Sequence, residues 1–206
     1  MRLFRPFFRS GLLWPDATFR IKTKNNELCL SFDDGPDPES TLKILEILKN
    51  HDIKALFFCT GLKAEKYPEL VNRICSGGHI IGNHGYRHLN GWKTSSGEYI
   101  KNVSDAAGFT SSDLFRPPYG RIRPSQYRKL AKSYKIIFWD LMPYDFDSKI
   151  GKNKTLAVLK KKIRPGSIIV LHDTVESTVP SFLEEFIDYA ENKGYKFIIP
   201  LFSGKK

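Results

Sequence analysis

Hydrophobic and polar positions alternate along this chain in a repeating rhythm of apolar runs and helical patterns. The run at 28–32 (LCLSF) is apolar on both faces and β-prone, which is typical of a central strand in a parallel sheet. Behind it, leucine and isoleucine recur with helical spacing over 39–49. The same alternation predicts further strands at 55–58, 80–82, 114–115, 136–141, 167–171 and 195–199, and further helices at 62–76, 97–107, 124–133, 154–163 and 180–192.

This rhythm of roughly seven strand and helix repeats is compatible with an open doubly wound sheet or with a closed barrel. An open sheet collects its site at one switch point, whereas a barrel brings the carboxyl ends of all its strands around one mouth. Reactive polar residues follow strands throughout this chain, so we predict a distorted, seven-stranded (β/α) barrel of the α/β class. We assign residues 27–206 to this domain, and residues 1–26 to a basic and aromatic extension that packs on it.

Composition and charge narrow the class of protein. A hydrophobic content of 41% with a net charge of +11 describes a globular domain that is attracted to polyanions. No nucleic-acid-binding motif accompanies this charge, so we interpret it as a solvated basic surface and expect no nucleic-acid partner. The 3 cysteines lack the spacing of a metal knuckle or a disulfide framework.

The amino-terminal stretch mixes aromatic residues with arginines, and its apolar runs are too short for a signal-peptide core. No later run has the length of a transmembrane helix. We therefore expect a cytoplasmic or peripherally membrane-associated protein, with contact between the amino terminus and a membrane surface as the alternative to packing on the barrel. The sequence leaves the oligomeric state open.

Two adjacent carboxylates, Asp33 and Asp34, follow the first strand and precede Gly35. Successive side chains on a strand point to opposite faces, so the two carboxylates are suited to different tasks, although a simple polar turn has the same composition. His84 and His88 are four residues apart, a spacing that matches one helical turn. Two imidazoles with one carboxylate form a catalytic zinc set that leaves one position for water.

Two further motifs carry polar groups. Arg116 precedes two prolines that hold the backbone rigid and leave the amide of Tyr119 to donate to an oxyanion. Arg116 is suited to pairing with Asp33, with a surface salt bridge as the alternative. His172 ends an apolar strand, where it is either a proton donor or a capped core histidine.

Taken in order, the motifs SFDDGP (31–36), NHGYRH (83–88), RPPYG (116–120) and IVLHD (169–173) resemble those of polysaccharide deacetylases of the NodB-homology type, carbohydrate esterase family four. The resemblance covers about Glu27 to the carboxyl end. It implies a distorted (β/α) barrel that deacetylates N-acetylated glucosamine polymers or, less commonly, O-acetylated sugars. The resemblance implies that Asp34, His84 and His88 bind a divalent metal, usually zinc, with Co²⁺ or another divalent ion as alternatives. It also implies that Asp33 is the catalytic base and His172 the acid. Arg116 would be the partner of the base, and the backbone amide of Tyr119 would donate to the oxyanion.

The sequence departs from this family pattern at Gly85, where a serine or threonine is usual, and at Met142, where the aspartate that supports the acid histidine is usual. We expect Asp140 to replace that aspartate, because strand alternation puts it on the same face as Met142, with Asp145 as the loop alternative. Apart from a deacetylase, we considered a glycan-binding barrel without turnover and, less favoured, a polyanion-binding protein.

Overall fold

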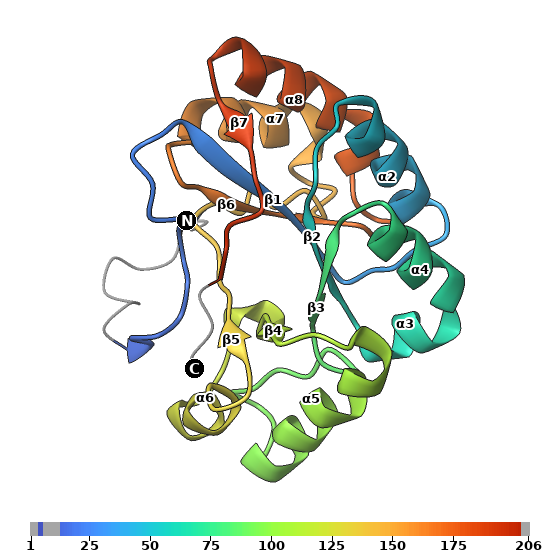
Figure 1. Ribbon diagram of the computed structural model, residues 1–206, viewed down its shortest axis with the longest axis vertical. Helices are drawn as coiled ribbons and strands as arrows, with labels where there is room; N and C mark the ends of the chain where they lie inside the picture. Colours follow the sequence, from blue (N-terminus) through green and yellow to red (C-terminus); the bar gives the residue numbers. More distant parts are fainter. Residues whose placement is uncertain (1–3, 6–12, 203–206) are drawn as a thin grey trace.

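The computed structural model describes residues 4–5 and 13–202. It confirms the predicted α/β barrel as a curled, entirely parallel sheet with the strand order β5-β4-β3-β2-β1-β6, to which β7 adds by pairing with β1. Helices surround the sheet on its outer side, with α2, α3 and α4 at the right of Figure 1, α5 and α6 below, and α7 and α8 above. The strands are β1 (Glu27–Asp33), β2 (Leu56–Cys59), β3 (Ile80–Asn83), β4 (Leu114–Phe115), β5 (Lys135–Ile136), β6 (Ile168–His172) and β7 (Lys196–Phe197). The helices are α2 (Ser40–Asn50), α3 (Gly61–Lys66), α4 (Pro68–Ser76), α5 (Ser96–Thr110), α6 (Pro124–Leu130), α7 (Gly151–Lys162) and α8 (Leu183–Asn192). Two short 3₁₀ turns are η1 (Pro118–Gly120) and η2 (Val179–Ser181).

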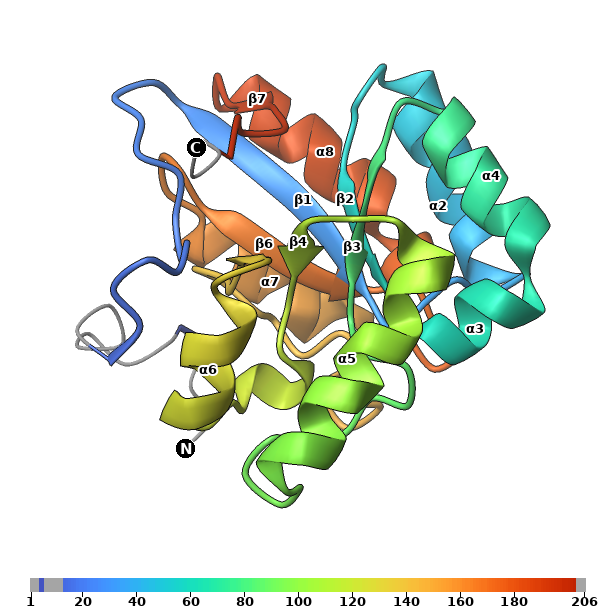
Figure 2. The same cartoon turned by 60° about the horizontal axis from the view of Figure 1, so that its bottom comes forward.

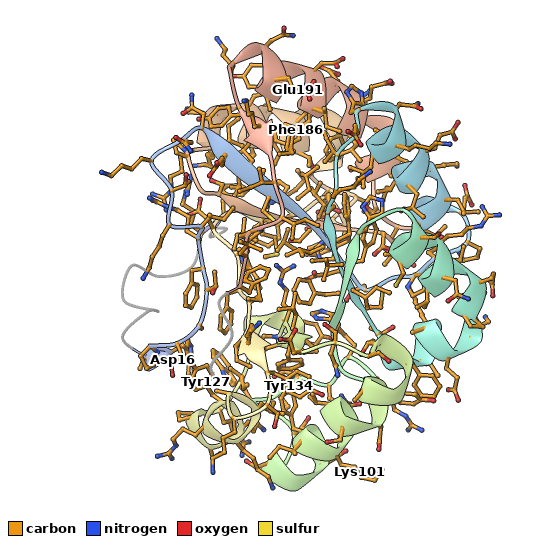
Figure 3. All side chains as sticks on the ribbon, in the orientation of Figure 1. Asp16, Lys101, Tyr127, Tyr134, Phe186 and Glu191 are labelled. Carbon is orange, nitrogen blue, oxygen red and sulfur yellow. The ribbon has the colours of Figure 1, made fainter. Side chains whose placement is uncertain are left out.

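Strand β1 is central, and its residues 28–33 are all buried, as the unbroken apolar run predicts. It pairs with β2 on one side and with β6 on the other, in a register that sets Asp33 opposite His172. Each helix covers the sheet with one apolar stripe. On α8, for example, Phe186 points toward the sheet and Glu191 points outward (Figure 3).

The helix predicted over 62–76 is two helices, α3 and α4, separated at Tyr67. Pro68 causes the break, because its ring has no N–H to donate and disfavours helical geometry in the residue before it. Tyr67 accordingly has φ −127° and ψ 59°, and Pro68 begins α4 instead. The loop between the two helices thus lets α3 follow the rim of the barrel beside the carboxyl end of β3.

The strand predicted over 136–141 is regular only at its start. Beyond β5 the chain leaves the ladder and makes isolated pairings, Ile137 with Thr18 and Leu141 with Ile169 of β6. Segment 137–141 therefore joins the two outer strands of the curled sheet. Residues 13–22 run along the same side, near α6 and β6 (Figure 2), and Ile21 donates its backbone amide to Gly166 at 2.8 Å.

Parts of the proposed extension 1–26 contact the barrel. The ring of Trp14 lies 4.9 Å from that of Tyr127, whose hydroxyl accepts from the amide of Asp16 (Figure 3). Phe4 packs against Tyr144 at 5.7 Å. Phe7, Phe8 and Leu12, on which the prediction also rested, lie outside the described residues. Within the described part of the chain, no helix has both the length and the apolar character needed to cross a bilayer.

Candidate active site

The carboxyl ends of β1, β3, β4 and β6 meet at one mouth of the barrel, where a cleft of about 610 Å³ opens. Asp33 and His172 are the last residues of their strands, and Asp34, His84 and Arg116 come directly after theirs. Parallel strands place these ends together because their carboxyl termini share one edge of the sheet. Every site residue predicted from the sequence except Asp140 is found in or directly beside this cleft.

Asp34, His84 and His88 offer three ligand atoms within 4.8 Å of one another. Asp34 Oδ1 lies 3.3 Å from Nε2 of His84 and 3.0 Å from Nε2 of His88. The spacing of the two histidines had suggested that they lie on one helical turn, but they do not. They lie in an irregular loop with a positive φ at Gly85 (73°) and at His88 (52°), and this loop brings the rings to 4.9 Å from each other.

The tautomer of His84 favours a cation between these three residues. Its Nδ1 lies 2.8 Å from the carbonyl oxygen of Arg116, which can only accept, so Nδ1 carries a proton and Nε2 is the nitrogen that offers a lone pair to a cation. That lone pair faces Asp34 Oδ1, a buried oxygen to which no described residue donates a hydrogen bond. Two acceptors facing one another require a proton or a metal ion between them, and the donor set suits zinc.

The charge of Asp34 is suited to the same task. Burial alone would raise the pKa of this carboxyl, but hydrogen bonds and charge from His84 and His88, when these rings carry a proton on Nε2, outweigh burial and hold the pKa well below its usual range. A cation bound in place of those protons acts in the same direction. Asp34 is therefore ionised and suited to binding a cation. Asp34 has a positive φ of 75°, and its Oδ1 and the Oδ2 of Asp33 both lie near Nε2 of His84, at 3.3 and 3.8 Å.

Asp33 is held by Arg116. Arg116 is fully buried, and its Nη1 donates to Asp33 Oδ1 at 2.6 Å and to the hydroxyl of Ser31 at 2.9 Å. The guanidinium lies 4.0 Å above the ring of Phe58. Burial lowers the pKa of Arg116, while the charge of Asp33 opposes that shift. This ion pair fixes one carboxylate oxygen and leaves Oδ2 near the histidine pair, 3.8 Å from His84 Nε2.

His172 lies at the end of the neighbouring strand and is bound by Asp145. Asp145 Oδ1 is 3.1 Å from His172 Nδ1, and Oδ2 accepts from the backbone amide of His172 at 2.9 Å and from the hydroxyl of Ser177 at 2.7 Å. Burial would lower the pKa of His172, but Asp145, Asp34 and Asp33 raise it to about 9. The imidazole is therefore protonated at neutral pH, with Nε2 available to the cleft.

Asp140 is not beneath His172, and our preference for it as the partner was wrong. Its carboxylate accepts from the side chains of Arg5, Arg164 and Ser167, on the side of the sheet away from the cleft mouth. The expected alternation fails because Asp140 lies in a bend rather than in a regular strand. Met142 does line the cleft, and a turn with a positive φ at Tyr144 (64°) returns the chain so that Asp145 reaches His172.

The loop after β4 supplies another wall. Pro117 and Pro118 carry no amide hydrogen, so Tyr119 has the first N–H of this loop, and its φ of 58° is in the left-handed region. The ring of Tyr119 lies 4.4 Å from the ring of His88 and is exposed to the cleft. Trp139 and Phe146, which sequence reasoning did not assign to the site, line the rest of this wall. Both residues follow β5 along the chain, and this position after a strand was the sequence feature that could have identified them as site residues.

Asp173 is a further residue that sequence analysis did not assign to the site, although it ends the IVLHD motif. It is fully enclosed beneath Gly35, where a Cβ atom would lie only 2.0 Å from its Oδ2, so this position of the acidic loop requires glycine. Burial raises the pKa of Asp173 to about 7, against the effect of a 2.7 Å hydrogen bond from Thr41. Asp173 thereby supports the loop that carries Asp33 and Asp34.

Comparisons with known proteins agree with this geometry. Residues 20–139 match the family model of polysaccharide deacetylases. The chain is 36% identical over 184 residues to a peptidoglycan-N-acetylglucosamine deacetylase of Bacillus cereus, covering 84% of this chain and 66% of that protein. It is 30% identical over 193 residues to the peptidoglycan-N-acetylmuramic acid deacetylase PdaA of Bacillus subtilis, covering 88% of this chain and 73% of that protein. It thus spans about two thirds of the length of these relatives.

Solved structures extend the comparison to the whole fold. The crystal structure of the Bc1960 peptidoglycan N-acetylglucosamine deacetylase in complex with a naphthalenyl N-oxidanyl-benzamide superposes with a TM-score of 0.87 at 31% identity, covering 94% of each chain. BA3943 of Bacillus anthracis, described as a CE4 family pseudoenzyme, superposes with a TM-score of 0.77 at 27% identity, covering 87% of this chain and 65% of that one. By sequence and by fold, this chain belongs to the polysaccharide deacetylase family.

Proposed function

We propose that this protein is a metal-dependent hydrolase that removes the acetyl group from N-acetylated sugars of a peptidoglycan-type glycan. The observation that carries the proposal is the arrangement of two separate ion pairs around one candidate metal site. Asp33 with Arg116 stands on one side of Asp34, His84 and His88, and His172 with Asp145 stands on the other. The names of the relatives support an N-acetyl sugar as the substrate.

Asp34, His84 and His88 would hold the metal ion. When bound, a divalent ion such as Zn²⁺ polarises the acetyl carbonyl and lowers the pKa of water. Asp33, with one oxygen fixed by Arg116, takes the proton from the attacking water through its free oxygen. The amide of Tyr119 donates to the oxygen that becomes negative.

His172 acts on the leaving group. An amide nitrogen cannot leave as an anion, so it must receive a proton as the bond to the acetyl carbon breaks. The pKa of about 9 at His172 keeps that proton on the imidazole at neutral pH. Asp145 fixes Nδ1 and so directs the other nitrogen, Nε2, to the substrate.

The test is acetate release from N-acetylglucosamine oligomers and from peptidoglycan by protein loaded with Zn²⁺ or Co²⁺. We expect release that is lost after chelation and restored by the metal. Asp33→Asn should retain the metal and lose at least about a hundredfold in kcat, because an amide cannot accept the proton of water. If the wild-type protein binds the metal but releases no acetate from any N-acetyl glycan, the proposed activity is wrong.

The second candidate is a glycan-binding protein without turnover, because BA3943 shares this fold and is described as a pseudoenzyme. The geometry of both ion pairs favours an active enzyme. Binding of N-acetylglucosamine oligomers without acetate release, by metal-loaded wild-type protein, would support the inactive alternative.

A further inference from the structure

The cleft continues beyond the candidate metal ligands into a second hollow of about 630 Å³. The two hollows share Asp34, His88 and Thr174 as lining residues, so they adjoin one another. We call the cleft described above the first arm of the binding site and the second hollow its second arm. A polymeric substrate whose acetyl group reaches the metal ligands would place neighbouring sugar units in both arms. The chemistry of the second arm therefore bears on which glycan fits.

The two arms differ in character. Beyond the candidate catalytic residues, the first is lined by aromatic side chains such as Trp139 and Phe146, which suit the faces of sugar rings. Its two other charged side chains, Arg121 and Glu176, are of opposite sign.

The second arm is lined by two cations, Lys63 and Arg87. In the described part of the chain, no carboxylate oxygen lies within 4.0 Å of either cation, although Lys63 is half-buried and Arg87 is exposed. The charge of Lys63 lowers the pKa of the buried Asp173, but only from beyond ion-pair distance. Partly burying a cation without a partner is costly unless a ligand supplies the opposite charge.

The backbone segments that carry the two cations are held in a fixed relation to the site. Lys63 lies on α3, whose first two amides, from Gly61 and Leu62, donate to the carbonyls of Gly85 and Tyr86 at 2.9 and 3.1 Å. The amide of Arg87 in turn donates to Asn102 Oδ1 at 2.8 Å. Helix α3 and the loop that carries His84 and His88, which we call the histidine loop, are thus hydrogen-bonded to each other directly. The backbone of the second arm is therefore preorganised.

Acidic groups around this arm are engaged elsewhere. Glu65, also on α3, accepts a hydrogen bond from the hydroxyl of Tyr86. Asp34 faces the two histidines and would be neutralised by a bound divalent ion. Glu176 lines the first arm rather than the second. The second arm is therefore positive, and a planar guanidinium beside an ammonium matches a carboxylate.

We propose that Lys63 and Arg87 form a subsite for a carboxylate borne by a sugar unit of the glycan, so that the enzyme prefers an acidic amino-sugar polymer over a neutral one. This inference rests on the proposed deacetylase function. It adds the class of substrate, since an alternating polymer in which every second sugar carries an ether-linked carboxylic acid supplies the anion, whereas a chitin-type polymer does not.

The test compares two oligomers of equal length, a peptide-free alternating oligomer of N-acetylglucosamine and N-acetylmuramic acid and a chitin oligomer. We expect wild-type protein to have the lower KM for the acidic oligomer. In the double variant Lys63→Ala with Arg87→Ala, the KM for the acidic oligomer divided by the KM for the neutral one should rise about tenfold. The wild-type preference should also weaken as salt rises from 50 to about 500 mM. Lys66→Ala is the matched control, because Lys66 is on the same helix but lies over the ring of Tyr67.

Binding is measured separately, by calorimetry with metal-loaded Asp33→Asn protein, so that the subsite is tested without turnover. Weaker binding of the acidic oligomer in the double variant supports the subsite even if wild-type protein releases no acetate. An unchanged KM ratio and unchanged binding would overturn the proposal. An effect seen only with oligomers that carry stem peptides would also overturn it, because the carboxylate would then belong to the peptide.

Discussion

The carboxylate of Asp145 lies 3.1 Å from Nδ1 of His172 and accepts a second hydrogen bond, 2.9 Å long, from the backbone amide of the same residue. This double contact fixes both the tautomer and the orientation of the imidazole. It also brings a buried negative charge to a ring that burial alone would make less basic, and the pKa rises to about 9. His172 thus holds a proton beside the cleft at neutral pH, as the proposed role of general acid requires.

The first prediction follows from this pair. Asp145→Asn removes the charge that raises the pKa of His172, so the imidazole loses its proton at lower pH. Because the proposed acid works in its protonated form, the alkaline limb of the kcat/KM profile should move down from about pH 9 by one unit or more, and activity at pH 8.5 should fall at least about threefold. The pH profile of acetate release from a soluble oligomer measures both.

Asp140→Asn is the contrasting variant. It should lower thermal stability, because the side chains of Arg5 and Arg164 lose their charged partner, but it should leave the alkaline limb in place. An alkaline limb that moves in Asp140→Asn and stays in Asp145→Asn would contradict the assignment of Asp145.

The second prediction concerns the metal. His88→Ala removes one of three ligand atoms, and we expect about one equivalent of Zn²⁺ in wild-type protein and at most about a tenth of that in the variant after dialysis. His84→Ala should do the same and should also free the carbonyl of Arg116. Metal content by atomic emission gives the answer without any activity assay. A full equivalent of metal in both variants would place the site elsewhere.

The sequence predicted most of this site because its residues follow strands directly. Asp33 and His172 end β1 and β6, and the register of those strands puts them opposite one another without any contribution from loops. For such positions, a strand boundary and a parallel sheet are sufficient to place a side chain at the barrel mouth.

The partner of His172 was not predictable in this way. Strand alternation was extended through Asp140 and Met142, but the chain there pairs only through isolated bridges and then turns at Tyr144. Likewise, Thr18 and Ile21 complete the side of the barrel through single contacts that leave no alternating pattern in the sequence. Lys63 and Arg87 line one hollow because α3 docks on the histidine loop, a tertiary contact between separate segments.

The third prediction tests Gly85, where the family usually has a serine or threonine. Its φ of 73° is unfavourable for other residues, and a Cβ atom would lie 2.6 Å from Asn102 Nδ2. Gly85→Ala should therefore lower the free energy of unfolding by about 1–3 kcal/mol. Urea denaturation measures this change.

Gly108→Ala is its control. Gly108 lies in α5 with no heavy atom within 4 Å of the added methyl group, so alanine there should be neutral or stabilising by about 0.5–1 kcal/mol. If Gly85→Ala is as stable as Gly108→Ala, the histidine loop is less constrained than its geometry indicates.

The last prediction concerns stability at acid pH. His79 is buried at the start of β3, where its Nδ1 accepts from the amide of Ala55 at 3.2 Å, and burial, together with the charge of Lys54, lowers its pKa to about 4. The unfolded chain has the ordinary value of about 6.5, so between pH 4 and 6.5 it binds more protons than the folded chain. The contribution of His79 to the free energy of unfolding is therefore complete above pH 6.5 and is lost as the pH falls through this window, by at most about 3 kcal/mol.

His79→Gln removes the titrating group and retains an oxygen that is able to accept from Ala55. We expect urea denaturation at a series of pH values to show a shallower loss of stability between pH 6.5 and 4 in the variant than in wild-type protein. The hydrogen bond of a glutamine differs in strength from that of an imidazole, but this difference shifts both ends of the curve equally and does not alter its slope. Parallel curves for the two proteins across this window would show that His79 titrates alike in the folded and unfolded states.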